Sequence, residues 1–292
     1  MHPPTIAFLA AIIVFSLIEY RWRMRTQRGY DLGALGGTVG TMIGQALAKA
    51  MTNGAIGFAM LGVFAWAPIQ WPLADWRTWL VGFFVLEFFY YWQHRFSHTI
   101  RWFWASHAVH HSPNELTLPA ALRLSWTSGI SGSWLFFLPM TLAGFHPMLV
   151  TTLLTINLQY QYFVHTEAVG RLGPLEWFLN TPSHHRVHHA SNPAYLDKNF
   201  GGVLIVFDRL FGTFQVERAD IRIAYGLTRR LSANNPFVIA FHEWRNLIRD
   251  VRSARSPHGV LRALFGRPGA PDGEWGSINP LSSPTIRARG EN

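Results

Sequence analysis

The chain has 292 residues, of which 49% are hydrophobic and only 14% charged, whereas soluble domains carry about 25% charged residues, so the composition is typical of a membrane protein. The sequence contains no cysteine, which excludes iron–sulfur clusters, thiolate zinc sites and disulfide scaffolds together. The net charge of +9 comes from basic residues that flank apolar segments, which favours anionic inner-leaflet lipid over nucleic acid as a partner.

Two apolar runs in the first quarter of the chain predict membrane-spanning helices. The run from Thr5 to Tyr20 has no basic residue ahead of it and no small-residue cleavage site behind it, so it indicates a spanning helix and not a signal peptide. The arginines between Arg21 and Arg28 place the end of this helix in the cytoplasm. The second run, from Thr38 to Ala67, leads outward to a tryptophan-rich loop, which is typical of the far interface.

Three further apolar runs extend this topology. The run from Thr78 to Gln93 returns inward and delivers His94 to the cytoplasmic face. The runs from Trp126 to Ala143 and from Pro147 to Val164 are separated by a GFHP turn, and we expect a hairpin that leaves and re-enters on one side. His165 then emerges beside His94. The sequence predicts an all-α integral membrane fold with about four transmembrane helices and a cytoplasmic cap rich in histidine.

The remainder of the chain predicts interfacial and irregular structure. The segment from Val203 to Phe214 is too short to span and is expected to pack under the cap or lie at the interface. An amphipathic helix opened by Asn234, Asn235 and Pro236 is expected to rest on the bilayer surface. We therefore expect a single membrane-embedded domain over residues 1–252, followed by an irregular tail over residues 253–292.

Ten of the fourteen histidines lie in three tight clusters and at one single position. Within a cluster the spacing is i, i+3 or i+4, which stacks imidazoles on one face of a helix. A structural zinc needs about four ligands and a catalytic zinc about three, so nine or ten histidines are about right for two ions. Imidazole suits iron, copper, zinc and nickel alike, so the ligand type does not select the metal. The ten residues are His94, His98, His107, His110, His111, His165, His184, His185, His188 and His189.

The order of these clusters resembles a known family. The patterns H-x3-H, H-x2-HH, an isolated histidine in FVHTE, and HH-x2-HH followed by DKNFGGVLIVFDRLFGTF resemble the fatty acid hydroxylase and sterol desaturase superfamily of membrane di-iron enzymes. The stretches QYFVHTE and NTPSHHRVHHASNPAYLDKNFGG look most like its alkylglycerol monooxygenase branch. The similarity covers about Leu80 to Glu217. The combined pattern is specific for the superfamily, but no motif is specific for a substrate.

The resemblance implies two irons held by histidines, with O2 as co-substrate. Many relatives have only H-x2-HH in the last box, so His184 is the one optional ligand. The family often has a second H-x3-H before that box, but Gln161 stands four residues before His165 here. One iron could therefore lack a histidine that Gln161, His184 or water would replace. The implied ligands are His94, His98, His107, His110, His111, His165, His185, His188 and His189.

The implied activity is hydroxylation of a C–H bond of a fatty acyl, alkyl-ether or sterol-type lipid. A lipid or sterol desaturase with the same di-iron site is the near alternative. A membrane protein that binds or transports metal is the distant one, although a transporter would place its ligands along the membrane interior. Electrons must come from outside, because the chain has no dinucleotide fingerprint and no haem or cysteine site. The resemblance implies a reduced pterin, a ferredoxin or a cytochrome b5 chain as donor.

Two carboxylates next to the histidine clusters are candidates to support the ligands. Metal-bound imidazoles usually donate their second N–H to an acceptor, and we expect Glu167 and Asp208 to accept such bonds. A helix cap or a surface salt bridge is the alternative for both.

Polar residues within the apolar runs are further candidates. Glu87 is a functional-site candidate because placing a carboxylate inside the membrane costs free energy. Lys49 could pair with it or extend to the membrane interface instead. Asn157, Gln159 and Gln161 form a polar stripe that could line a lipid head-group pocket, or could simply pack between helices.

Overall fold

The computed structural model describes residues 3–269, and over this range the fold is all helical, as predicted, with two isolated β-bridges and no strand. Four short 3-10 helices connect the α-helices: η1 (Leu118–Leu122), η2 (Ser133–Phe137), η3 (Gly173–Trp177) and η4 (Pro193–Tyr195). The α-helices are α1 (Pro3–Arg25), α2 (Leu32–Phe64), α3 (Trp76–Thr99), α4 (Arg101–His107), α5 (Leu138–Leu142), α6 (Pro147–Val164), α7 (Pro182–His188), α8 (Val206–Leu210), α9 (Pro236–Ser253) and α10 (Pro257–Phe265).

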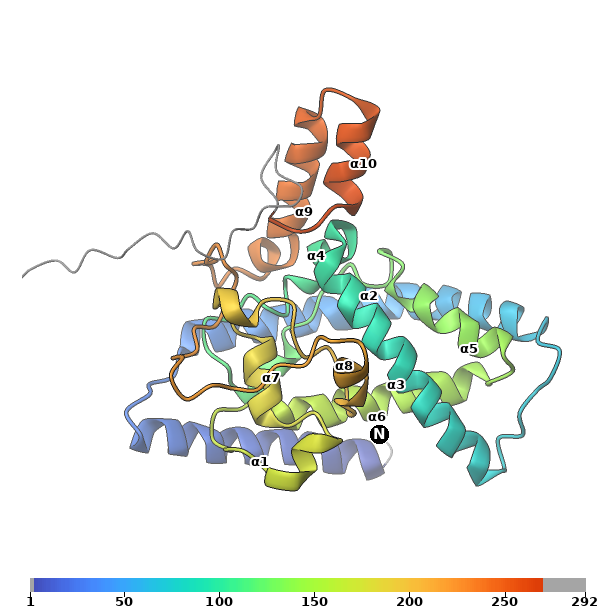
Figure 1. Cartoon of the computed structure of the whole chain (residues 1–292), viewed down its shortest axis with the longest axis horizontal. Coiled ribbons are helices and arrows are strands. Elements are labelled where there is room, and N and C mark those ends of the chain that lie inside the picture. Colours follow the sequence, from blue (N-terminus) through green and yellow to red (C-terminus); the bar gives the residue numbers. More distant parts are fainter. Residues whose placement is uncertain (1–2, 270–292) are drawn as a thin grey trace, which may run out of the picture.

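The long helices α1, α2 and α6 lie roughly along one direction, with α3 crossing them (Figure 1). Among the described residues, α2 is the helix whose length and hydropathy together would allow it to cross a membrane. The C-terminal ends of α1 and α6 and the N-terminal end of α2 lie at the same end of the molecule, on the left of Figure 1. The tryptophan-rich loop between α2 and α3 lies at the opposite end.

Asparagine and aspartate side chains fix where three of the helices begin. The Asp31 carboxylate accepts from the N–H of Ala34 at the start of α2, and Asp75 accepts from Arg77 at the start of α3. Asn235 accepts from two N–H groups at the start of α9, and Pro236 occupies its first turn. These contacts satisfy N–H groups that a helix start would otherwise leave open.

The predicted helix from Trp126 to Ala143 does not form. This segment consists of turns, η2 and the five-residue α5. Gly132 adopts a φ of 84°, and Pro139 stands in the first turn of α5, so neither residue fits the interior of one long helix. The hydroxyl of Ser131 donates to the Ser128 carbonyl, so a side chain and not a helical N–H satisfies this backbone acceptor.

The apolar core sits where α3, α5 and α6 meet. Leu86, Met140 and Leu149 are fully buried there and belong to one cluster. Gly82 faces Leu149, and a Cβ at that position would approach the leucine side chain to 2.8 Å. The lack of a side chain at Gly82 therefore lets α3 and α6 come close together.

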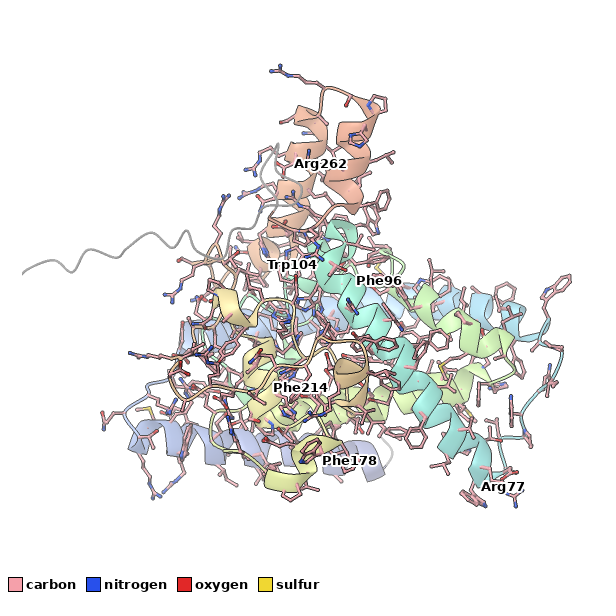
Figure 2. The ribbon with its side chains drawn as sticks, viewed as in Figure 1. Arg77, Phe96, Trp104, Phe178, Phe214 and Arg262 are labelled. Atoms are coloured by element: carbon pink, nitrogen blue, oxygen red, sulfur yellow. The ribbon has the colours of Figure 1, made fainter. Side chains whose placement is uncertain are left out.

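The C-terminal part of the described chain is a helical hairpin and not the irregular tail expected from residue 253. After α9, Ser256 accepts from the Gly259 N–H and Pro257 begins α10, a start signal that the sequence analysis missed. The hairpin of α9 and α10, on which Arg262 lies, projects from the body of the molecule (Figure 2). The expected tail beyond residue 269 lies outside the described residues.

This hairpin is attached to α4 by its backbone and by charges. The N–H of Arg101, the first residue of α4, donates to the Gly266 carbonyl at 2.9 Å. The Arg101 guanidinium also pairs with Glu243 at 3.3 Å and Asp250 at 2.7 Å on α9. The amphipathic pattern predicted for α9 is present, because Ile239, Ala240 and Leu247 are buried against the protein, whereas Phe237, Phe241 and Ile248 are exposed.

Candidate metal centre

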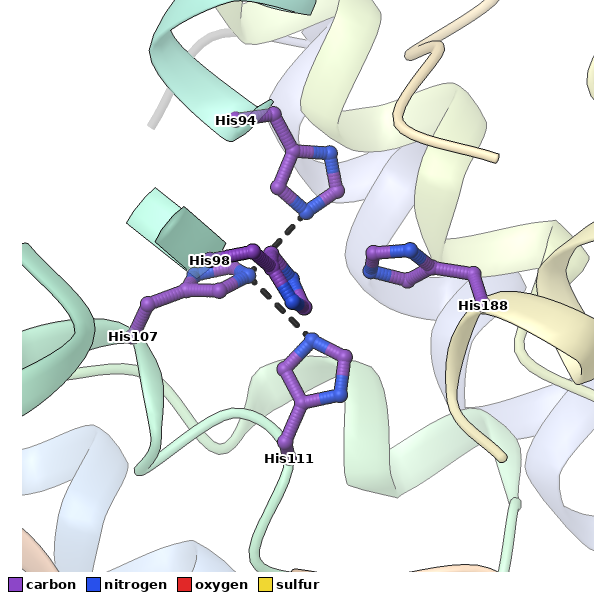
Figure 3. A group of neighbouring side chains, drawn as sticks. All are labelled: His94, His98, His107, His111 and His188. Carbon is purple, nitrogen blue, oxygen red and sulfur yellow. Dashed lines mark hydrogen bonds between the residues drawn. The ribbon is translucent and has the colours of Figure 1, made fainter. Parts of the chain in front are cut away.

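Five histidines from three segments converge on one point, and we call them the five-histidine group: His94, His98, His107, His111 and His188. Two stand one turn apart near the end of α3, one ends α4, one lies in the turn after α4, and one is on α7. One ring nitrogen of each lies within 4.8 Å of the others. Figure 3 shows the five rings arranged around a shared central space.

Four more histidines form a second cluster, which we call the four-histidine group: His110, His165, His185 and His189. His165 caps the C-terminal end of α6, and His189 caps α7. All four are buried. The two groups are adjacent, because the rings of His111 and His189, one from each group, stack with centroids 4.3 Å apart.

The spacing of the ring nitrogens fits metal ions. The Nε2 atoms of His94 and His107 lie 3.0 Å apart, and those of His165 and His185 lie 2.9 Å apart. Two imidazoles that bind one ion at about 2.0–2.1 Å, at right angles, place their nitrogens about 3 Å apart. The buried Nε2 atoms of His98, His188 and His189 have no hydrogen-bond partner in the described chain. The nitrogens present therefore suit two neighbouring metal ions.

Burial also sets the protonation state that metal binding needs. Desolvation lowers the pKa of His110 to about 4 and the pKa values of His185 and His188 well below the usual value. Neutral imidazole is the form that binds a metal, so near pH 7 these rings are ready to act as ligands.

Backbone carbonyls, not carboxylates, accept the second N–H of three rings. The Nδ1 atom of His94 lies 2.8 Å from the Phe200 carbonyl, and that of His188 lies 3.0 Å from the Lys198 carbonyl. The Nδ1 atom of His165 lies 2.5 Å from the Gln161 carbonyl on α6. These contacts fix the ring orientation and leave Nε2 to face the centre. These acceptors leave no signal in the sequence, because every residue type has a backbone carbonyl.

Asp208 supports the five-histidine group indirectly, and not by the direct bond to a histidine that we expected. Its carboxylate accepts from the N–H groups of Phe200 and Gly201, both at 2.7 Å, and from the hydroxyl of Thr213 at 2.6 Å. Burial raises the pKa of Asp208 to about 6. The carboxylate thus holds the loop whose Phe200 carbonyl orients His94.

Glu167 does not contact a histidine either, and the salt-bridge alternative is what the structure shows. Its carboxylate pairs with Arg23 at 2.7 Å and with Arg28 at 3.0 Å, so it joins the segment after α6 to the end of α1. Arg23 is buried, and it also pairs with Glu115 at 3.2 Å.

Glu87, Asn157 and Gln161 form a buried hydrogen-bond chain behind the four-histidine group. Glu87 accepts from the Asn157 amide at 2.5 Å and from the N–H groups of Val203 and Leu204. Asn157 in turn accepts from Gln161, whose own side-chain oxygen accepts from a tyrosine hydroxyl on α3. Asn157 and Gln161 therefore pack between helices, which is the alternative given for them above. Lys49 makes no ion pair with Glu87 in the described chain.

Neither substitute for a missing ligand faces the centre. The side chain of Gln161 is engaged in this chain, and His184 lies outside both groups. The Nδ1 atom of His184 lies 3.2 Å from the Leu179 carbonyl, and its ring packs edge-on against Phe214, which Figure 2 labels.

Several residues that the sequence analysis did not select hold the last histidine box. Arg186 bonds to two backbone carbonyls after His165 and pairs with Glu217 at 2.6 Å. Asn199, at a φ of 57°, donates to the carbonyls of His184 and Gln215. Asparagine tolerates this left-handed conformation better than most residues. The DKN sequence could therefore have indicated a tight turn at this position.

A helical fold that gathers nine histidines, most of them buried, in two adjacent groups defines a protein with a candidate histidine-rich metal site. Residues 79–213 match the model of the fatty acid hydroxylase family, and this part of the chain belongs to that family. The match agrees with the resemblance expected from the histidine boxes.

The chain is similar to several alkylglycerol monooxygenases. It is 44% identical to the Homo sapiens protein over 203 residues, which cover 70% of this chain and 44% of the relative. It is 38% identical to the Xenopus tropicalis protein over 212 residues, which cover 73% of this chain and 46% of the relative. A more distant relative is the ornithine lipid hydroxylase OlsE of Rhizobium tropici, with 28% identity over 56% of this chain and 49% of that protein.

The chain thus spans less than half the length of the alkylglycerol monooxygenases that it matches. No solved structure matches the chain.

Proposed function

We propose that this chain is a membrane-bound, O2-dependent lipid hydroxylase whose two irons are held by the nine histidines. The observation that carries the proposal is the pair of adjacent groups of largely buried, neutral imidazoles with nitrogens spaced for metal binding. Relatives at 38–44% identity are alkylglycerol monooxygenases, which supports an alkyl-ether lipid as the substrate class. When bound, an iron pair with O2 would supply the strong oxidant that an unactivated C–H bond requires.

The residues of the chain position and protect this chemistry. In the proposal, the five-histidine group holds one ion and the four-histidine group holds the other. The carbonyls of Phe200 and Lys198 orient two ligands of the first ion, and the carbonyl of Gln161 orients one ligand of the second. Hydroxylation of the carbon beside an ether oxygen gives a hemiacetal, which collapses to an aldehyde and an alcohol.

The proposed topology places α1, α2, α3 and α6 in the membrane and the histidines at the cytoplasmic face. Support comes from the arginines between Arg21 and Arg28, which lie at the same end of the molecule as the end of α6. The electron donor, of the pterin, ferredoxin or cytochrome b5 type, would approach from that side. The basic residues there would also attract anionic lipid.

Turnover of a defined ether lipid under labelled oxygen tests the reaction. Iron-loaded protein in detergent would be given 1-O-hexadecylglycerol, a reduced pterin and 18O2, with 1-palmitoylglycerol as the matched lipid that lacks the ether. We expect hexadecanal with 18O from the ether lipid alone. Consumption of O2 without an oxygenated lipid, or reversible binding of many metal ions without turnover, would contradict the proposal.

Reporters of membrane sidedness test the topology separately. Reporters inserted after Gln27 and near Pro193 should both read cytoplasmic, and one near Ala74 should read external. An external reading near Pro193 would place the last histidine box across the membrane from the first two, and the proposed orientation would be wrong.

A further inference from the structure

A large polar cavity lies beside the C-terminal end of α1, and none of the nine clustered histidines lines it. Its volume is about 920 Å³, which is within the range of small-molecule sites. Most of its wall comes from the end of α1, the segment after α6 and residues 217–225, and Asn114, Glu115 and Arg186 complete it.

The charged lining of this cavity is unbalanced. Three glutamates face the space, against six arginines, and Arg218 also pairs with Asp220, so two positive charges on the wall have no carboxylate to balance them. The carboxylates are Glu115, Glu167 and Glu217, and the guanidinium groups are Arg23, Arg28, Arg171, Arg186, Arg218 and Arg222.

The buried arginines are matched, so the excess charge falls on exposed ones. Arg23 pairs with two glutamates, and Arg186 pairs with Glu217. Arg171 is exposed and bonds to a backbone carbonyl of residue 217, with no carboxylate partner in the described chain. The side chain of Arg222 is also exposed and has neither an ion pair nor a hydrogen bond in that range.

We propose that this cavity binds a phosphate group. Guanidinium groups present paired N–H donors that match phosphate oxygens, and several of them around one concave space favour a multiply charged anion over a single carboxylate. The cavity holds no member of the histidine groups, so the proposed site is separate from the metal centre and does not depend on the proposed hydroxylase activity.

The phosphate could belong to a lipid head group or to a soluble compound, because the recognition chemistry is the same. The position supports the lipid source. Leu17 and Ile18, one to two turns before Arg23 on α1, expose 58% and 56% of their surface, so an acyl chain could lie along α1 beside the cavity.

Binding of defined phosphate probes to the purified full-length protein tests the proposal. Titrations at fixed detergent would compare dioctanoyl phosphatidic acid, glycerol 3-phosphate, inorganic phosphate and dioctanoyl phosphatidylcholine. We expect saturable binding of at least one of the first three and weaker binding of phosphatidylcholine. Binding of phosphatidic acid alone identifies a lipid source, and equally tight binding of glycerol 3-phosphate or inorganic phosphate identifies a soluble one.

Charge-neutralising variants locate the binding. The double variant Arg28→Gln, Arg222→Gln removes two exposed guanidinium groups from the wall, and we expect binding to weaken about tenfold. The matched control, Arg252→Gln with Arg255→Gln, removes the same charge near the end of α9, outside the cavity, and should change affinity by less than about twofold. Arg171→Gln with Arg222→Gln repeats the test if the first variant has a lowered melting temperature. Absence of binding by all three phosphate probes, or an equal loss in the control, would overturn the proposal.

Discussion

The two histidine groups contain the same ligand type but are held in different ways. In the five-histidine group, His94 and His188 are oriented by carbonyls of a loop that is distant in sequence from α3. In the four-histidine group, His165 is oriented by a carbonyl of its own helix, α6. The first group also has one more histidine than a tetrahedral ion needs, whereas the second has none to spare. Two sites with the same ligand type can therefore differ in how well they tolerate the loss of one ligand.

Removal of one histidine from each group should have the largest effect. We expect His110→Ala to lower the iron content from about two to about one ion per chain, since only three histidines remain in its group. His188→Ala leaves four histidines and should retain more iron. Both variants should lose activity by at least about a hundredfold, because loss of even an outer-shell partner costs 10–100-fold. The iron content per chain, measured by plasma mass spectrometry with membrane insertion as the control, tests this difference. Equal iron loss in both variants would mean that the two groups tolerate the loss of a histidine equally.

Acid should destabilise the iron-free protein through both groups. Folding lowers the pKa of the buried histidines, so below their unfolded value of about 6.5 the unfolded chain takes up protons that the folded chain cannot. The stability that depends on neutral rings is complete above that pH and falls as the pH falls, by at most about 1.4 kcal/mol per pH unit for each histidine.

The melting temperature of iron-free protein in detergent at pH 7.5 and pH 5.5 measures this dependence. We expect a clear decrease at pH 5.5 and a smaller decrease in His110→Ala, which has one buried ring fewer. Equal melting temperatures at both pH values would mean that the rings are hydrated.

Asp208→Asn should weaken the five-histidine group more than the four-histidine group. The amide retains one acceptor oxygen but presents an NH2 group to a backbone N–H of the loop that contains Phe200. We expect about tenfold weaker binding of one iron, in line with the loss of an outer-shell contact. Asp220→Asn, at an exposed site, is the matched control. Titration with a chelator, with the iron retained per chain measured at each step, distinguishes loss of one iron from loss of both. Uniform loss of both irons would argue against a local effect.

His184→Ala should have the smallest effect on metal. The ring contacts Phe214 and the Leu179 carbonyl and belongs to neither group. We expect unchanged iron content and a melting temperature lower by a few degrees, as for the loss of a modest buried contact. A loss of iron as large as in His110→Ala would make His184 a ligand.

The sequence predicted the helical class and the histidines that lie together in the structure, because both depend on local patterns. Spacing of i, i+3 and i+4 is visible in the residues themselves, and the nine histidines assigned from the resemblance are the nine that the structure gathers. Hydropathy alone could not show that residues 126–143 form turns and short helices, since Gly132 and Pro139 override an apolar run. The support of the rings was equally hidden, because Phe200 and Lys198 act through their carbonyls.

The bond between Arg101 and Gly266 has a consequence for biosynthesis. All nine clustered histidines have been synthesised once residue 189 is added, but α4, which ends at His107, is fixed at its first residue by a carbonyl made 77 residues later. This contact between α4 and the α9–α10 hairpin can therefore form only after residue 266 has been synthesised, later than every histidine of the two groups. A ribosome stalled before residue 266 would carry a nascent chain that contains all nine clustered histidines but lacks this contact to α4.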